Sequence, residues 1–333
     1  MIPIRVAIIG YGLSGRYLQA PFFAAHPGFR VVRIVTSRED EVRTDFPGLE
    51  ATAKVETVLA DPAVDLVAIC TPNATHYDLT RAALDAGKHV LVDKPACPTA
   101  FQLREVRDLA ASKNLRLFVF QNRRWDSDFL TVQQVLQNGD LGRLVQYEAR
   151  YDRWKPEPNA KAWKETPGPG AGMLYDLGAH ILDQAIVLFG RPHNVSGHTW
   201  SERPGSDIPD AFHLWLDYGT HRATLSCSVL VREPTARYRL HGDRGSFVKY
   251  GIDQQEDHLK AGLRPGDAGF GDEPAAQWGI LHTSAGRITQ PTLTGNWYGL
   301  FDNIHTVLTK GEKPAVPLDD VVLQLEIIES VAG

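Results

Sequence analysis

The first third of the chain alternates short apolar runs with segments of helical spacing, and this alternation restricts the possible folds more than any other feature. Apolar runs flanked by turn residues predict strands at residues 5–9, 30–35, 66–70, 89–92 and 115–120. Helical spacing of apolar residues predicts helices at 15–25, 75–86 and 100–113. Because strands and helices alternate, the sequence predicts an α/β domain with a parallel, doubly wound sheet.

The part of the chain beyond residue 122 has a different pattern. One helix is expected at 125–137, closed by Asn138-Gly139, and a final helix at 318–331. Long apolar runs at 143–151, 211–218, 222–231 and 236–241 favour larger strands joined directly, most of them antiparallel. We therefore expect a first domain over 1–122 and a second, α+β domain with a large open sheet over 123–333. The Gly/Pro-rich stretches 155–172 and 253–277 are expected to be functional or mobile loops.

Length, charge and cysteine content exclude several classes of protein. A chain of 333 residues has room for about two domains. Its net charge of −5 provides no basic surface for a nucleic acid backbone. No apolar run approaches the ~18 residues that cross a bilayer, and the N-terminus resembles a strand instead of a secretion signal, so we expect a cytoplasmic protein without membrane partners. Cys70, Cys97 and Cys227 fit neither a disulfide framework nor a metal site, and we expect reduced packing thiols.

A glycine-rich turn, Gly10-Tyr11-Gly12-Leu13-Ser14-Gly15, follows the first predicted strand and opens the first helix. This G-x-G-x-x-G spacing permits a tight turn, and the helix N-terminus offers N–H groups to a pyrophosphate. The alternative is a structural turn without a ligand. The strand before it, the helix after it and a second strand at the expected distance favour the dinucleotide interpretation, with contacts from Gly10, Gly12, Leu13, Ser14 and Gly15.

The end of the second predicted strand bears on which dinucleotide binds. A chain that prefers NAD usually has an acidic residue there, about twenty residues after the glycines, for the ribose hydroxyls. This chain has Thr36-Ser37-Arg38, in which no carboxylate repels a 2′-phosphate and both Ser37 and Arg38 have donors for it. We therefore expect NADP. NAD stays an alternative, because Glu39 and Asp40 follow directly and Arg38 is otherwise a solvated side chain at a strand end.

Two further polar turns follow predicted strands of the same sheet. Thr71-Pro72-Asn73, with His76 just beyond, follows the third strand, and Asp93-Lys94-Pro95 follows the fourth. Open α/β sheets bind ligands at the carboxyl ends of their strands. Each segment taken alone is an ordinary polar turn, but a Pro directly after Lys94 ends the strand and directs the Lys out of it.

A third polar segment lies in the second half of the chain, where a loop with glycines at 170 and 172 leads into a helix. Asp176 and His180 are four residues apart, so both side chains project from one face of that helix. This is the arrangement of an acid/base pair that serves one pocket. The alternative is structural, with Asp176 capping the helix and His180 a hydrogen-bonded, half-buried imidazole.

In this order, these motifs resemble the glucose-fructose oxidoreductase, inositol dehydrogenase and rhizopine-catabolism (Gfo/Idh/MocA) family over nearly the whole chain. Segments 121–126, 175–180 and 247–253 are most similar to its NADP-dependent inositol dehydrogenase branch. The resemblance implies a Rossmann domain, a second domain with an open sheet, and a site in the cleft between them. The chain departs from the family at Asp93, where Glu is more frequent, and at Gly170-Ala171-Gly172, which replaces a glycine triplet.

The resemblance also implies a reaction, which is hydride transfer between NADP(H) and a secondary alcohol or ketone of a cyclic polyol or sugar. Lys94, Asp176 and His180 match the catalytic positions of the family. His180 would take the hydroxyl proton, Lys94 would stabilise the alkoxide charge or relay the proton, and Asp176 would orient the imidazole. A cis Lys94–Pro95 bond is implied as well.

Contacts with cofactor and substrate follow from the motifs and the resemblance together. Cofactor contacts are expected at Gly10, Gly12, Leu13, Ser14, Gly15, Ser37, Arg38, Thr71, Pro72, Asn73, His76, Asp93, Lys94 and Asn122. Substrate contacts are implied at Arg123, Asp176 and His180. Arg153, Trp154 and Trp163 are added only because of their place in the long loop. No metal site is expected.

Two other functions fit the same residues. One is a non-catalytic NADP-binding regulator, against which the presence of Lys94, Asp176 and His180 argues, and the other is a reductase of a non-sugar ketone or imine. We also expect a homodimer or homotetramer. Helices cover only one face of an open sheet, and along 212–218 and 224–230 neither side-chain row is uniformly polar, which predicts association through the outer face.

Overall fold

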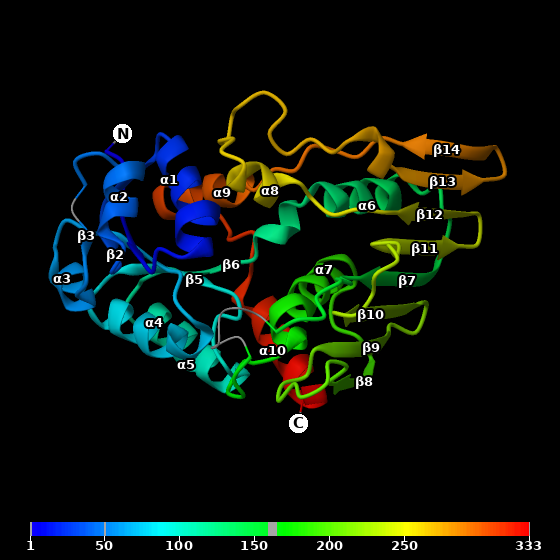
Figure 1. The fold of residues 1–333 in the computed structure, drawn as a ribbon, viewed down its shortest axis with the longest axis horizontal. Coiled ribbons are helices and arrows are strands. Elements are labelled where there is room, and N and C mark those ends of the chain that lie inside the picture. The colour runs from blue at the N-terminus through cyan, green and yellow to red at the C-terminus, as the bar shows by residue number, and fades with distance from the viewer. Residues whose placement is uncertain (1, 50, 159–164, 333) are drawn as a thin grey trace. The chain divides into compact units, whose positions relative to one another are not determined.

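A computed structural model describes residues 2–49, 51–158 and 165–332 of the chain (Figure 1). By their internal contacts, these residues form two compact units. The first unit comprises Met1–Gln121, Glu256–Phe270 and Trp297–Val322, and the second comprises Asn122–Gln255, Gly271–Asn296 and Leu323–Gly333. The units therefore differ from the expected 1–122 and 123–333 in two later segments, which return to the first unit.

The described part of the first unit is built on a six-stranded parallel sheet in the order β3-β2-β1-β4-β5-β6. Its strands are β1 (Ile4–Ile9), β2 (Phe29–Val35), β3 (Ala51–Thr52), β4 (Leu66–Ile69), β5 (His89–Asp93) and β6 (Leu117–Phe120). This is the strand order of a Rossmann fold, and it confirms the predicted doubly wound sheet. The order reverses between β1 and β4, so the carboxyl ends of these two strands flank the point where such sheets bind dinucleotides.

Helices connect these strands as predicted, with two differences. They are η1 (Leu13–Gln19), α1 (Ala20–Ala25), α2 (Glu39–Asp45), α3 (Val55–Ala60), η2 (Asn73–Thr75), α4 (His76–Asp85) and α5 (Ala100–Ser112). The first helix begins as a π-helix and becomes α-helical only at Ala20, next to Pro21, whose missing N–H interrupts the hydrogen-bond ladder. The sequence does not predict the short elements α2, β3 and α3, because each has too few apolar residues to show a helical or strand-like spacing.

An aromatic cluster explains why a late segment belongs to the first unit. Helix α9 (Tyr298–Lys310) buries Phe301 against Phe22 and Phe23 of α1, with ring centroids 5.0 and 4.9 Å apart. Trp297, just before α9, is fully buried, and its ring centroid lies 6.2 Å from that of Phe22. These large rings bury several hundred square ångströms of apolar surface, on the order of 150–250 Å² each, which holds α9 on the sheet unit.

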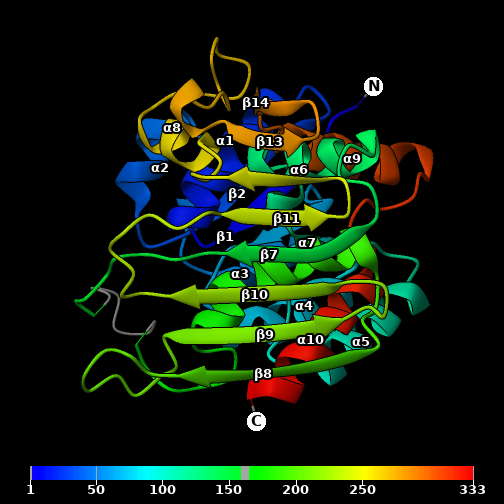
Figure 2. The same cartoon turned by 90° about the vertical axis from the view of Figure 1, so that its right-hand side faces the viewer.

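The described part of the second unit contains an eight-stranded sheet in the order β14-β13-β12-β11-β7-β10-β9-β8 (Figure 2). Its strands are β7 (Leu144–Arg150), β8 (Asn194–Trp200), β9 (Ala211–Asp217), β10 (Arg222–Ser228), β11 (Tyr238–Gly242), β12 (Gly245–Lys249), β13 (Gly279–Thr283) and β14 (Gly286–Gln290). Neighbouring strands pair antiparallel, except β7 with β10, so the predicted open, mostly antiparallel sheet is confirmed.

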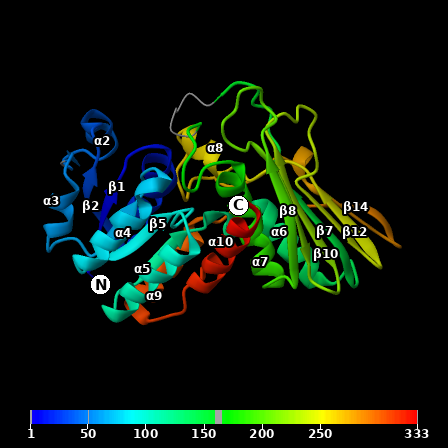
Figure 3. The same cartoon turned by 90° about the horizontal axis from the view of Figure 1, so that it is seen from below.

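Helices cover one face of this sheet (Figure 3). They are η3 (Asn122–Trp125), α6 (Ser127–Asn138), η5 (Leu174–Gly178), α7 (Ala179–Phe189) and the end of α10 (Leu318–Ala332). The buried side chains between sheet and helices include Tyr147, Phe212, Tyr238 and Phe247 from the strands and Ile181 from α7. Helix α6 ends at Gly139 in the left-handed conformation, as the Asn138-Gly139 pair predicts.

The stretch 253–277, which its Gly/Pro content predicts to be a functional or mobile loop, is partly helical. It contains α8 (Gln255–Lys260) and η6 (Ala275–Gln277), and the fully buried Lys249 anchors it. The Lys249 ammonium donates to Glu273 at 2.6 Å and to the carbonyls of Tyr250 and Gln277 at 2.6 and 2.8 Å. The other Glu273 oxygen accepts a 2.6 Å bond from Ser127 at the start of α6. A buried ion pair therefore ties this stretch to the sheet and to α6.

Candidate dinucleotide and catalytic site

The turn between β1 and η1 has the shape that a dinucleotide requires. Gly10 has φ +93°, and a Cβ there would lie 2.7 Å from the Cys70 carbonyl oxygen. A Cβ on Gly15 would lie 2.0 Å from the Gly10 carbonyl oxygen, so only glycine fits either position. A Cβ on Gly12 would meet no atom within 4 Å, which leaves the outer side of the turn open. The turn thus fits a pyrophosphate that approaches the backbone at Gly12.

Side chains beneath this turn bind one another. The Ser14 hydroxyl donates to Asp93 Oδ1 at 2.9 Å, and the buried Gln19 amide donates to the same oxygen at 2.7 Å. Burial raises the pKa of the Asp93 carboxyl, while the charges of His76 and Lys94 oppose that shift. Ser14 and Asp93, both predicted as cofactor contacts, therefore join the glycine turn to the end of β5.

The end of β2 places Arg38 beside the glycine turn. Its backbone N–H donates to Thr36 Oγ1 at 3.0 Å, and its guanidinium donates to the Tyr11 carbonyl at 3.4 Å. The guanidinium is half exposed and lies 3.7 Å from Glu41 of α2. A cation thus stands next to the turn, where an NAD-preferring chain has its acidic residue.

The carboxyl ends of β4 and β5 are joined through His76. This residue is fully buried, and its two ring nitrogens lie 2.7 Å from the Pro95 carbonyl oxygen and 2.8 Å from that of Thr71. Both ring nitrogens thus face backbone carbonyls, and the cofactor contact expected of His76 stays a prediction. The Lys94–Pro95 bond is cis, as expected.

In the second unit, Asp176 lies in the π-helix η5 and His180 in the first turn of α7. Gly172, before the helix, has φ +93°, and a Cβ there would lie 3.0 Å from the Pro209 carbonyl oxygen. Gly170 also has a positive φ of +77°, whereas Ala171 between them does not. Replacement of the middle glycine of the family triplet is therefore compatible with this loop.

Buried polar contacts hold α7 in place. The Arg124 guanidinium donates two hydrogen bonds to the Asp183 carboxylate, at 2.8 and 2.7 Å. The side-chain amide of Gln184 donates a third, to the Arg123 carbonyl at 2.9 Å. These contacts fix the helix that carries His180, which is only 6% exposed. Sequence reasoning missed Arg124 and Gln184, although Arg124 lies in segment 121–126, on which the resemblance partly depends.

Arginines gather around one tyrosine ring near this helix. The guanidiniums of Arg123, Arg153 and Arg237 lie 5.4, 5.1 and 4.4 Å from the centroid of the buried Tyr151 ring. Burial raises the pKa of the nearby Cys227 thiol, and the charges that act on it include those of Arg153 and Asp176. Arg123 and Arg153 therefore lie against the same buried ring of the second unit.

Other predicted site residues are placed differently. Trp154 is 47% exposed, with the Arg232 guanidinium 5.4 Å from its ring centroid. Trp163 lies outside the described residues. Asn122 is buried at the start of η3. Lys94 belongs to the first unit and Asp176 and His180 to the second, so their convergence on one substrate stays a prediction.

Two other kinds of site are absent from the described residues. Among the described residues, no group of three or more His, Cys, Asp or Glu side chains is arranged to hold a metal ion. No helix in the described ranges is long and apolar enough to span a membrane. Cys70, Cys97 and Cys227 are buried free thiols.

Comparison with known proteins identifies the family. Residues 4–121 match the oxidoreductase family with an NAD-binding Rossmann fold, and 133–332 match the C-terminal alpha/beta domain of the same Gfo/Idh/MocA family. The chain is 38% identical over 331 residues to scyllo-inositol 2-dehydrogenase (NADP(+)) IolW of Bacillus subtilis, covering 98% of this chain and 92% of that protein. It is 41% identical to the oxidoreductase YdgJ of Escherichia coli, covering 98% and 94%.

Solved structures agree with this result. The oxidoreductase YvaA from Bacillus subtilis superimposes with a TM-score of 0.95 at 37% identity, covering 98% of this chain and 95% of that one. Because both family domains match in order and full-length relatives exceed 30% identity, this chain belongs to the Gfo/Idh/MocA family of oxidoreductases.

Proposed function

We propose that the protein transfers hydride between NADP(H) and a secondary alcohol or ketone of a cyclic polyol or sugar. The observation that carries this proposal is the placement of Asp176 and His180 on the consecutive helices η5 and α7, which Arg124–Asp183 and the bond from Gln184 to the Arg123 carbonyl hold in place. Among the relatives, IolW is named as a scyllo-inositol dehydrogenase, and two others are named as a levoglucosan dehydrogenase and a D-glucoside 3-dehydrogenase. These names support a polyol or sugar substrate.

In this reaction the chain's own residues handle the proton and the charge. When bound, NADP(H) supplies the group that accepts or gives the hydride. His180 takes the hydroxyl proton, a role that suits an imidazole near neutral pH. The Lys94 ammonium stabilises the developing alkoxide, and Asp176 orients the imidazole and accepts a bond from a neighbouring substrate hydroxyl.

A turnover screen tests this function. The protein is incubated with NADP or NAD and cyclic polyols or aldoses, and with NADPH or NADH and the corresponding ketones, and absorbance of the reduced nicotinamide is followed. We expect turnover with a polyol or sugar. Binding of NADPH without any turnover would instead favour a non-catalytic regulator, and turnover only with non-sugar ketones or imines would favour the other reductase.

NADP preference gives a first prediction. Replacing Arg38 by Ala should weaken NADP(H) binding by about 1.5–3 kcal/mol, the usual contribution of a charged hydrogen bond, and leave NAD(H) binding unchanged. Fluorescence titration of both reduced cofactors measures this difference. Arg43→Ala is the control, because Arg43 lies on α2, the helix that follows Arg38, pairs with Asp40 and is 70% exposed. Equal affinity for both cofactors in wild type and in Arg38→Ala would contradict the prediction.

We further propose a homo-oligomer that buries the outer face of the eight-stranded sheet. The outward residues of β10 itself, Arg222, Thr224, Ser226 and Ser228, are polar, and the row expected to be mixed over 224–230 adds the apolar Leu230 just beyond the strand. Apolar surface on this face comes from Trp200 and Trp215, which are 42% and 53% exposed.

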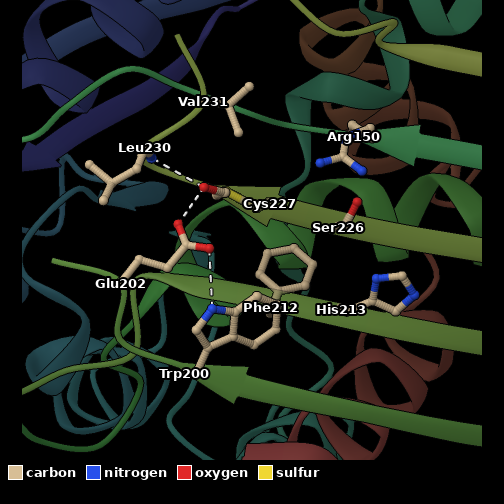
Figure 4. A pocket seen from close by; sticks show the side chains of 10 residues that line it. Arg150, Trp200, Glu202, Phe212, His213, Ser226, Cys227, Leu230 and Val231 are labelled. Atoms are coloured by element: carbon tan, nitrogen blue, oxygen red, sulfur yellow. Dashed lines mark hydrogen bonds between the residues drawn. The ribbon is translucent and has the colours of Figure 1, made fainter. Parts of the chain in front are cut away.

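A hollow on this face supports the same proposal (Figure 4). It measures about 470 Å³, and Arg150, Trp200, His213 and Ser226 are among its lining residues. The Ser226 hydroxyl is buried, yet no described residue bonds it. A second copy that enters the hollow would supply this missing partner, and it would cover the two tryptophans.

Light scattering tests the association. Wild type should give twice or four times the 36.9 kDa chain mass. Trp215→Glu should shift the mass toward the single chain, because it places a charge at the centre of the buried face. Phe101→Glu is the matched control, since Phe101 is a 66% exposed aromatic on α5 of the first unit. A wild-type mass near that of one chain would refute the proposal.

A further inference from the structure

His76 lies among hydrogen-bond acceptors only. It is the first residue of α4 and is fully buried. Its Nδ1 lies 2.7 Å from the Pro95 carbonyl oxygen, and its Nε2 lies 2.8 Å from the Thr71 carbonyl oxygen. Carbonyl oxygens only accept, so each contact requires an N–H on the ring. A neutral imidazole has one N–H, and only the imidazolium cation has two.

A second buried histidine of the same unit shows the contrast. His26 Nδ1 accepts a bond from the Gly28 N–H at 2.9 Å, and its Nε2 lies 3.0 Å from an oxygen of Asp302. One ring nitrogen accepts and the other donates, which a neutral imidazole satisfies completely. The two acceptors around His76 therefore distinguish it from an ordinary buried histidine of this fold.

Neighbouring charges can balance a cation at this position. Burial raises the pKa of the Asp93 carboxyl on β5, and the nearby charges of His76 and Lys94 oppose that rise. Asp93 also accepts bonds from Ser14 and Gln19, so its carboxylate is fixed near the glycine turn. A buried cation also bonds two backbone carbonyls elsewhere in this unit. The Lys88 ammonium donates to the carbonyl oxygens of Asp61 and Val64 at 2.7 and 2.9 Å.

We propose that His76 is a positioning residue that, as an imidazolium, ties the loop after β4 to the turn after β5 and thereby sets the position of Lys94. This role rests on the proposed function, because only that function makes Lys94 catalytic. The tie is direct, since Pro95, whose carbonyl His76 binds, is the next residue after Lys94. Loss of one donor leaves two carbonyl oxygens with a single partner, so the two loops separate and the ammonium shifts away from the reacting oxygen.

Nitrogen NMR of the wild-type protein tests the protonation directly. Protein labelled with ¹⁵N-histidine is recorded near neutral pH with NADP present, and the His76 signals are assigned by their loss in His76→Gln. Both His76 nitrogens should appear protonated, whereas His26 should show one protonated and one bare nitrogen. A bare nitrogen on His76 would overturn the proposal. This readout does not depend on turnover, so it stays decisive even if the proposed reaction fails.

Kinetics test the positioning role. In His76→Gln, which replaces the cationic ring and its two separate N–H donors with a neutral amide, kcat should fall about 10- to 100-fold, the cost of a small misplacement of a catalytic group. KM for the polyol should change much less. His76→Lys restores a cation with donors for both carbonyls and should recover most of the lost kcat. His26→Gln is the control and should lower the melting temperature without lowering kcat. Wild-type kcat in His76→Gln, or no recovery in His76→Lys, would overturn the role.

Discussion

Replacing His180 by Ala is expected to lower kcat by about 10²–10⁴, the usual contribution of a general acid or base. The affinity for NADP(H) should stay unchanged, because the glycine turn and Arg38 belong to the other unit. Steady-state kinetics with the best polyol or sugar gives kcat, and NADPH fluorescence gives the affinity. The expected loss is large because no other imidazole is placed on η5 or the first turn of α7 to replace this one.

The structure also predicts that this loss is local. Arg124–Asp183 and Gln184–Arg123 hold α7 independently of the His180 ring, so the variant should keep the wild-type melting temperature within a few degrees. His282→Ala serves as the control, because His282 is an exposed histidine on β13 of the same unit. Asp176→Asn should lower kcat as well, since an amide does not hold the imidazolium that forms. If His180→Ala kept wild-type turnover, the acid/base assignment would be wrong.

The parts of the site that sequence predicts are those with local stereochemical demands. Gly10 at φ +93° and Gly15 against the Gly10 carbonyl admit only glycine, so the motif is visible in the sequence. Strand-end turns such as Asp93-Lys94-Pro95 are similarly local, because apolar runs mark where each strand stops. The π-helical starts of both site helices are not predictable in this way, since the pattern of apolar residues does not separate a π-turn from an α-turn.

Contacts between distant residues escape sequence reasoning altogether. Arg124 and Asp183 are 59 residues apart in the sequence, and Arg237 and Asp128 are 109 residues apart. No local pattern of residues therefore predicts either buried ion pair. The same holds for Phe301 on Phe22, which draws α9 back to the first unit. Strand β8 was missed for another reason: its sequence, Asn194–Trp200, is polar and alternates exposed with half-buried residues, as an edge strand can.

Lys249 gives the largest expected effect on stability. Replacing it by Ala removes the only cation that bonds Glu273 among the described residues and leaves a buried carboxylate beside Ser127. Breaking a buried ion pair in this way usually costs about 3–5 kcal/mol. Urea unfolding followed by tryptophan fluorescence measures this loss. Lys260→Ala is a matched control, because Lys260 bonds Glu256 at the same 2.6 Å distance but is 43% exposed, and such pairs contribute about 0.3–0.5 kcal/mol.

The pH dependence of that loss identifies its cause. Burial raises the pKa of the Glu273 carboxyl, and the Lys249 charge opposes this shift. Without Lys249, the folded-state pKa rises further above the unfolded value, so the folded protein binds a proton more readily. Stability of Lys249→Ala is then greatest at low pH and falls as pH rises through the folded pKa of Glu273. The cost relative to wild type should therefore be smaller at about pH 5 than at about pH 8. A cost that matches the Lys260→Ala control at both pH values would show that the buried pair does not hold this stretch of chain.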